Sequence, residues 1–361
     1  MDFFNYGKKL YKLFHDIPEA SGKETVTRYS IEKICSKLNK FKCIYNNDQG
    51  LVYSLTETGN YNYDLGFRAE LDALIFPNTK CYHGCGHDAH ITSLLLFMTY
   101  LQHNADTKAK SMIFIFQSSE EEGNGAAEMV EFLMDKKIRI EKMIGIHNAP
   151  EISADTIAIK HGPTLANNVT NRVKVKFKTM DRFHHSSVKN QISIWEPVYD
   201  MVKNLNDVHE DAVFTIGEFS TDGRIGTQAQ SMNFTLSMRS NILTLAQLTC
   251  IFDEFLEKIK SFTDVDNIRY WNVNYHWRIN NDRNIYNSIK NNSLFNQLLI
   301  PNSFTSDDFC YYERVSNHVF YFFVGNYISP EKSRIHSESY EMNDDFLSSM
   351  LNIYRYIVKE V

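Results

Sequence analysis

The sequence predicts an α/β fold in which a mostly parallel, doubly wound sheet is interrupted by an inserted α+β domain of the ferredoxin-like type. Strand-like and helix-like segments alternate through the first 160 residues and return after residue 280. The segment between them follows the order β-α-β-β-α-β. Polar clusters come directly after several apolar strands, at the edge where doubly wound sheets bind their ligands.

The first part of the chain carries the alternation. Apolar residues recur at helical spacing within 4–40, with a break at Ile17–Gly22, and Ser21 ahead of Glu24 resembles a capping box. Ser111–Phe116 is a nearly continuous apolar run, which is typical of a strand buried on both faces. The remaining predictions are strands at Phe41–Tyr45, Leu51–Leu55, Tyr63–Ala69 and Lys142–Ile146, and helices at Ile91–Met98 and Ala126–Met134.

The middle of the chain has a different pattern. Arg172–Lys178 alternates between apolar and charged residues as a half-exposed strand does, and Leu245–Phe262 has the period of an amphipathic helix. We expect one domain to comprise residues 1–160 and 280–361, and the inserted domain to comprise 161–279. The other predicted elements are helices at 191–206, Asn284–Leu298 and Asp344–Val358, and strands at Ala212–Phe219, Gln230–Arg239, Arg269–Arg278 and His318–Val324.

Composition narrows the class of protein. The 361 residues carry 38 basic and 44 acidic side chains, a formal net charge of −6, so neither a nucleic-acid nor a membrane-surface partner is expected. The N-terminus lacks the pattern of a signal peptide, and no apolar run reaches the length of a membrane span. Six scattered cysteines do not indicate a disulfide framework. We therefore expect a cytoplasmic protein.

The densest concentration of reactive side chains is Cys81–His90. These ten residues hold two thiols, three imidazoles and one carboxylate, and a helix-like apolar run follows at once. Thiolate sulfur and imidazole nitrogen are the ligands that zinc and similar divalent metals prefer. The alternatives are a packed loop or a redox pair formed by Cys81 and Cys85.

Three further positions could complete a metal site: the pair Glu120 and Glu121, His147, and His336. Glu120 and Glu121 follow a buried strand, where carboxylates are costly unless cations or donors compensate them. Taken alone, this pair could equally mark a helix N-terminus, and His147 after the next strand could be a structural histidine. Together, Cys85, His87, Glu121, His147 and His336 suit a hydrolytic site with two metal ions, in which Glu120 accepts the proton of a water molecule.

The chain resembles the amidohydrolase branch of the aminoacylase/carboxypeptidase-type metallopeptidases, which includes hippurate hydrolase, N-acetyldiaminopimelate deacetylase and the plant auxin-conjugate hydrolases. The resemblance extends over nearly the whole sequence, and the Cys-Gly-His-Asp segment at 85–88 is its most specific part. The matching motifs are Arg-Ala-Glu-Leu-Asp-Ala-Leu at 68–74, His-Gly-Cys-Gly-His-Asp-Ala-His at 83–90, Gln-Ser-Ser-Glu-Glu at 117–121, Gly-Ile-His-Asn-Ala-Pro at 145–150, Ser-Asp-Asp-Phe at 306–309, His-Ser at 336–337, and Leu13–Glu19 followed by Glu24 and Thr25.

The resemblance implies a role for each candidate residue. Two divalent ions, zinc or manganese with nickel or cobalt as further options, would be held by Cys85, His87, Glu121, His147 and His336. The catalytic residues would be Glu120 as general base, Asp72, and a lid histidine that holds the oxyanion. His185 is our choice for that histidine, with His184 as the alternative. The inserted domain would act as a lid and form a homodimer.

The resemblance also implies a substrate class, an N-acyl and specifically an N-acetyl amino acid or derivative, whose amide bond is hydrolysed. Glu70 stands where the family has aspartate, the loop between Leu74 and Cys81 is short, and Thr221–Ala229 departs from the family's lid segment. These departures concern the substrate pocket more than the metal site. Two alternatives remain open, a dipeptidase with the same metal core and a binding protein that keeps the metal without turnover.

Overall fold

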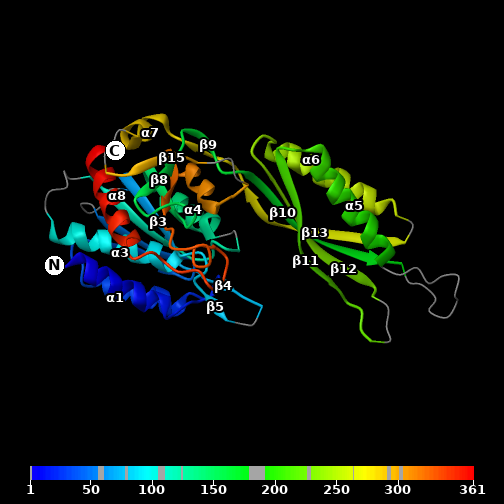
Figure 1. Ribbon diagram of the computed structural model, residues 1–361, viewed down its shortest axis with the longest axis horizontal. Helices are drawn as coiled ribbons and strands as arrows, with labels where there is room; N and C mark the ends of the chain where they lie inside the picture. Colours follow the sequence, from blue (N-terminus) through cyan, green and yellow to red (C-terminus); the bar gives the residue numbers. More distant parts are fainter. Residues whose placement is uncertain are drawn as a thin grey trace. The chain divides into compact units, whose positions relative to one another are not determined.

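The structure is a computed structural model that describes residues 2–55, 61–77, 80–104, 110–122, 125–178, 192–225, 229–262, 264–290, 294–300 and 304–361. The chain divides into two compact units. The first unit comprises Met1–Thr164, Ile279–Pro301 and Asp308–Val361, and the inserted unit comprises Leu165–Arg278 with Asn302–Asp307. Figure 1 shows the two units with their helices and strands.

The first unit is built on an eight-stranded, mostly parallel sheet, as the sequence predicts. Its central strands β6, β3, β7 and β16 run parallel, and β2 joins β6 in the antiparallel direction. In spatial order the strands are β1 (Lys42–Asn47), β2 (Gly50–Leu55), β6 (Met112–Gln117), β3 (Asn62–Glu70), β7 (Arg139–Ala149), β16 (Ser316–Gly325), β8 (Thr156–Ile159) and β15 (Asn296–Leu299). Two short pairs accompany it, β4 (Leu74–Ile75) with β5 (Cys81–Tyr82), and β9 (Gly162–Thr164) with β14 (Ile279–Asn281).

Both faces of this sheet are covered, which explains why β6 is buried along its whole length. One face shares a single apolar core with five helices, α1 (Phe3–His15), α2 (Thr25–Cys35), α3 (His87–His103), α7 (Arg283–Lys290) and α8 (Phe346–Glu360). Ile144 and Ile146 of β7 face that core, so Gly145 between them faces the other side. There Phe309 of the 3₁₀ helix η1 (Asp308–Arg314) packs on Gly145, and η1 contacts α4 (Gly125–Asp135). The doubly wound arrangement is confirmed.

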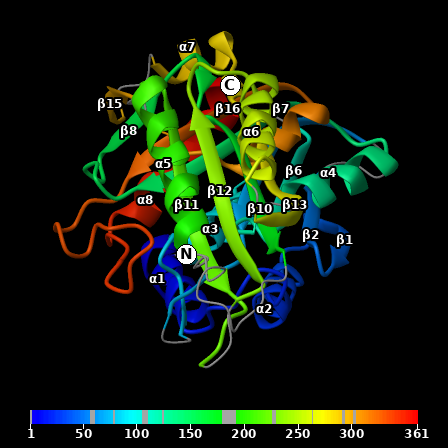
Figure 2. The ribbon, with the colours of Figure 1, turned by 90° about the vertical axis from the view of Figure 1, so that its right-hand side faces the viewer.

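The inserted unit has the predicted order β-α-β-β-α-β. Its elements are β10 (Asn167–Phe177), α5 (Ile192–Val208), β11 (Ala212–Thr221), β12 (Ser231–Ser240), α6 (Leu245–Lys260) and β13 (Val265–His276). The antiparallel sheet has the order β11-β12-β10-β13, and α5 and α6 pack on it in one apolar core (Figure 2). Alternation along β10 buries Val173 and Val175 and exposes Lys174, as expected for a half-exposed strand.

One predicted element is wrong. The helix expected over Asn284–Leu298 ends at Lys290, and Asn296–Leu299 forms strand β15. Residues 291–293 are Asn-Asn-Ser, which favour turns over helix interiors because their side chains compete for backbone hydrogen bonds. Asn296–Leu299 then pairs in parallel with β8, a strand that the sequence patterns did not reveal. In the part of the chain that the structure describes, no helix has both the length and the apolar character of a membrane span.

Candidate metal centre

Cys85 and His87 lie where the loop after β5 enters α3. Gly86 between them caps the helix with a left-handed φ of 85°. A Cβ atom at this position would lie 2.6 Å from the Tyr340 hydroxyl and 2.7 Å from the Asn148 amide nitrogen, so only glycine fits. This sharp turn projects the thiol and the imidazole towards the carboxyl ends of the neighbouring strands.

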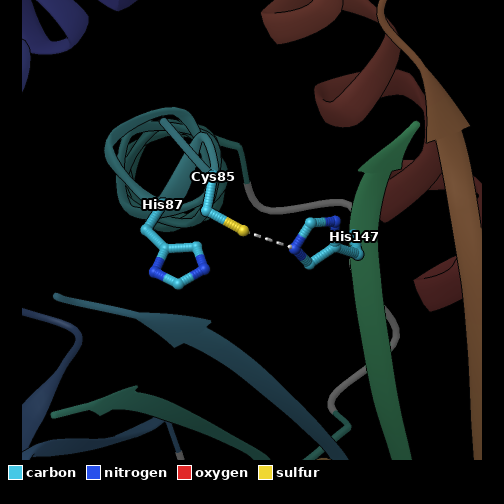
Figure 3. Close-up of side chains that lie close together, drawn as sticks. All are labelled: Cys85, His87 and His147. Carbon is cyan, nitrogen blue, oxygen red and sulfur yellow. Dashed lines mark hydrogen bonds between the residues drawn. The ribbon is translucent and has the colours of Figure 1, made fainter. Parts of the chain in front are cut away.

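The thiol of Cys85 lies between two imidazoles. Its Sγ is 3.4 Å from Nε2 of His147 on β7 and 3.6 Å from Nε2 of His336. Sulfur at about 2.3 Å and nitrogen at about 2.1 Å from a tetrahedral ion would lie about 3.6 Å apart, so these spacings match two ligands of one metal. Figure 3 shows the Cys85 sulfur pointing at the ring of His147, with His87 beside it.

Hydrogen bonds fix the tautomers of two of these histidines. Nδ1 of His87 donates to the Asp72 carbonyl at 2.8 Å, and Nδ1 of His147 donates to the Asn148 carbonyl at 2.8 Å. Each ring therefore presents Nε2 to the site. His87 Nε2 lies 3.9 Å from Glu120 Oε2 and 3.9 Å from Glu121 Oε1. Within the described residues this buried nitrogen has no hydrogen-bond partner.

The carboxylates enter from the loop after β6. Glu120 and Glu121 are each 15% exposed, and Oε1 of Glu121 has no hydrogen-bond partner in the described chain. Two groups of ligand atoms, each within 4.8 Å, share the Cys85 sulfur. One is Cys85, His87 and His147, and the other is Cys85, Glu121 and His336. Two overlapping groups are what a pair of adjacent ions would require.

Burial and neighbouring charges shift the pKa values of three of these side chains. Burial raises the pKa of the Cys85 thiol well above its usual range and lowers the pKa of His147 to about 3. Burial opposes a charged His87, but the hydrogen bond that its ring donates to Asp72 and the nearby carboxylates raise its pKa to about 10. A divalent ion would replace the protons of the thiol and of His87, so these residues fit the metals that their sulfur, nitrogen and oxygen donors suggest.

The structure brings together most of the residues that the sequence singled out. Cys85, His87, Glu120, Glu121, His147 and His336 meet at one site, and Asp72 lies behind His87, with its Oδ1 3.4 Å from Nδ1. His184 and His185 lie outside the described residues, as does part of the segment Thr221–Ala229. Asp88, which follows His87 in the chain, forms a hydrogen bond with Nδ1 of His15 at 2.7 Å.

A buried polar network lies behind the site, and the sequence did not predict how its members are connected. Nδ1 of His90 donates to Glu70 at 2.9 Å, and its Nε2 accepts from the backbone of Asn148 at 3.1 Å. Glu70 also pairs with Arg68, which pairs with Asp308. The sequence offered a signal for part of this network, because Arg68, Glu70, His90 and Asp308 lie in the matching motifs. It offered none for Tyr340, whose hydroxyl donates to Asn148 at 2.8 Å.

Glu24 is another buried carboxylate at this edge, and we expect it to make the stability of the protein depend on pH. Burial raises its pKa from 4.5 to about 7. Between these values the folded protein holds a proton that the unfolded chain releases, so the free energy of unfolding falls as the pH rises. E24Q removes this titration, and its stability relative to the wild type should increase from about pH 5 to about pH 8. Thermal unfolding of both proteins tests this, and a difference that is independent of pH would contradict it.

Comparisons with known proteins identify relatives of this chain. N-acetyldiaminopimelate deacetylase of Listeria innocua is 34% identical over 176 residues, which are 45% of this chain and 46% of that protein. An uncharacterised hydrolase of Staphylococcus aureus is 31% identical over 163 residues, 42% of each chain. The chain thus spans less than half the length of the curated relatives that it matches.

Solved structures share the fold along nearly the whole chain. A dinuclear metal-binding peptidase of the M20 family from Bacillus subtilis has a TM-score of 0.72 at 17% identity, covering 99% of this chain and 97% of that one. The aminobenzoyl-glutamate utilization protein of Klebsiella pneumoniae has a TM-score of 0.74 at 13% identity, covering 98% and 96%. The model of peptidase family M20/M25/M40 matches residues 66–360. The chain therefore belongs to peptidase family M20/M25/M40.

Proposed function

We propose that this member of the M20 hydrolase family cleaves the amide bond of a small N-acyl amino acid or derivative, most simply an N-acetyl one, and releases a carboxylate and an amine. The observation that carries the proposal is the convergence of Cys85, His87, Glu121, His147 and His336 beside the carboxylate of Glu120. The similarity to N-acetyldiaminopimelate deacetylase supports the acyl substrate.

In this proposal the five converging side chains hold two divalent ions. Bound there, such ions would polarise the substrate carbonyl and acidify a water molecule. The hydrogen bonds of His87 and His147 orient their rings in advance, so little reorganisation accompanies binding. The mixed sulfur, nitrogen and oxygen donor set suits zinc, and manganese, nickel or cobalt are further options.

Glu120 is the proposed general base. Its carboxylate is 15% exposed and lies 3.9 Å from His87 Nε2, so it borders the ligands and remains open to water. It would take a proton from the attacking water and deliver it to the leaving nitrogen. Asp72 would support this step by holding the loop that carries the base, since its Oδ2 accepts from the backbone of Glu121 at 2.9 Å. His185 of the inserted unit would stabilise the oxyanion.

We also propose a homodimer formed through the inserted unit. Among the described strands of that unit, β13 lies at an edge of the sheet and pairs on one side only, with β10. It exposes Trp271 (49%) and Tyr275 (40%), the kind of aromatic side chains that interfaces contain. Light scattering of the purified protein and of a Trp271→Glu variant tests this, and a wild-type monomer at micromolar concentration would reject it.

Metal analysis and a substrate panel test the proposed activity. The protein, purified without chelators, is expected to retain close to two divalent ions per chain. It is then assayed with N-acetyl, N-benzoyl and N-succinyl amino acids and with dipeptides, and the release of free amine is measured. Turnover of dipeptides alone would identify a dipeptidase. A folded protein that contains no metal, or one that binds the panel without turnover, would reject the proposal.

A further inference from the structure

We infer that the loop between α1 and α2, residues Glu19–Glu24, positions the catalytic carboxylate and one metal ligand through two separate contacts. Glu24 holds the backbone that precedes Glu120, and Ser21 holds the Asp72 carboxylate behind His87. The inference rests on the roles proposed above for Glu120 and His87. It makes Glu24 and Ser21 positioning residues, since neither belongs to the proposed ligand set.

The loop lies against both strand ends that carry the site. The backbone of Ala73 donates to the Glu19 carbonyl at 2.8 Å, and Ala20 forms a bridge with Ala73. Gly22 turns the loop with a φ of 71°, and a Cβ there would lie 3.7 Å from the Ser119 hydroxyl. The loop therefore reaches the segment after β3 on one side and the segment after β6 on the other.

The first contact concerns the base. Oε1 of Glu24 accepts a hydrogen bond from the backbone N–H of Ser119 at 2.8 Å. Ser119 has a left-handed φ of 59°, a backbone conformation that residues other than glycine rarely adopt without support from their surroundings. A hydrogen bond to a carboxylate gives such support. Because Glu120 is the next residue, the conformation of Ser119 sets the direction in which the Glu120 side chain leaves the backbone.

The second contact concerns the metal ligand. The Ser21 hydroxyl donates to Oδ2 of Asp72 at 2.6 Å, and the same oxygen accepts from the backbone of Glu121. The Asp72 carbonyl accepts from His87 Nδ1, so the conformation of this one residue orients the imidazole. Loss of the serine hydroxyl would remove one of the two hydrogen bonds to Oδ2 of Asp72 and so loosen the residue that orients His87.

These contacts are not explained by the capping of α2. Glu24 occupies the N-cap position but makes no side-chain capping hydrogen bond. Glu19 caps the helix instead, since its carboxylate accepts hydrogen bonds from the backbone N–H groups of Val26 at 3.1 Å and Thr27 at 2.8 Å. The sequence-based expectation that Ser21 caps this helix is wrong for the same reason. The Glu24 carboxylate is 1% exposed, and burying it costs free energy that no capping hydrogen bond offsets. This cost favours a role for Glu24 at the site.

The loop therefore offers three variants with different expected effects. E24A should lower kcat by about 10- to 100-fold, with KM and metal affinity within about twofold of the wild type, whereas E24Q keeps an acceptor and should retain most of kcat. S21A should weaken metal binding by about tenfold, with kcat restored at saturating metal. E19A, the matched control in the same loop, should lower the melting temperature and leave both quantities unchanged.

The measurements are steady-state kinetics at saturating Zn²⁺ or Mn²⁺, metal affinity by competition with a chelating dye, and thermal unfolding. E24A with wild-type kcat, or E24A and E19A with equal losses, would overturn the role of Glu24, and unchanged metal affinity in S21A would overturn that of Ser21. If E24A does not fold, E24D keeps the charge, shortens the reach and carries the same expectation. An active E120Q would instead reject Glu120 as the base of the proposed function, so the two failures are distinguishable.

Discussion

Replacing Glu120 by glutamine is expected to lower kcat by about 10²- to 10⁴-fold, the usual contribution of a general base. The amide cannot accept the proton of the attacking water, although it has nearly the size of the carboxylate. Because Glu120 lies outside the proposed ligand set, the metal content and the melting temperature should stay close to those of the wild type. Kinetics on the best substrate of the panel, together with metal analysis of the same preparation, tests this expectation.

Glu122 supplies the matched control for this experiment. It lies two residues along the same loop and is exposed, so E122Q makes the same chemical change without touching the site. Its kcat should remain within about twofold of the wild type. If E120Q keeps comparable activity, Glu120 is not the base, and the proton must pass through another group.

Replacing Arg68 by methionine is expected to destabilise the first unit by about 3–5 kcal/mol. The Arg68 side chain is 1% exposed and pairs with Glu70 and Asp308, both 0% exposed. The guanidinium keeps the pKa of Glu70 low against the effect of burial, with help from His90. Methionine removes this positive charge and leaves two buried carboxylates without it. Urea unfolding at neutral pH, followed by circular dichroism, measures the change.

Lys8 provides the comparison for Arg68 in the same unit. Its ion pair with Asp344 is exposed on both sides, at 40% and 77%, so K8M should cost at most about 1 kcal/mol. A loss of less than about 1 kcal/mol for R68M as well would show that the network accommodates the missing charge, for instance by protonation of Glu70.

Much of the first unit could be predicted because strands that are buried on both faces have a recognisable apolar sequence. The nearly continuous apolar run that forms β6 has to lie inside a sheet covered on both faces. The parallel direction of β3, β6 and β7 then places Asp72, Glu120 and His147 at one edge. For these residues local pattern and global fold agree, so composition and spacing sufficed.

The remainder depends on contacts between distant parts of the chain. The Cys85 sulfur and the His336 imidazole meet across 251 positions, and no local pattern predicts that contact. Ser21 and Glu24 act through single hydrogen bonds to segments that no periodicity connects with them. The prediction for residues 296–299, which form strand β15, was wrong for a similar reason. Their conformation comes from pairing with β8 and not from their own sequence pattern.

The position of β16 has a consequence for synthesis on the ribosome. This strand lies between β7 and β8, inside the sheet, yet it is translated only after the whole inserted unit, Leu165–Arg278. Until then β7 presents an open edge to the cell, the situation in which a nascent chain needs protection from aggregation. His336 arrives later still, so the nascent chain can assemble the complete set of proposed metal ligands only when nearly all of it has been made.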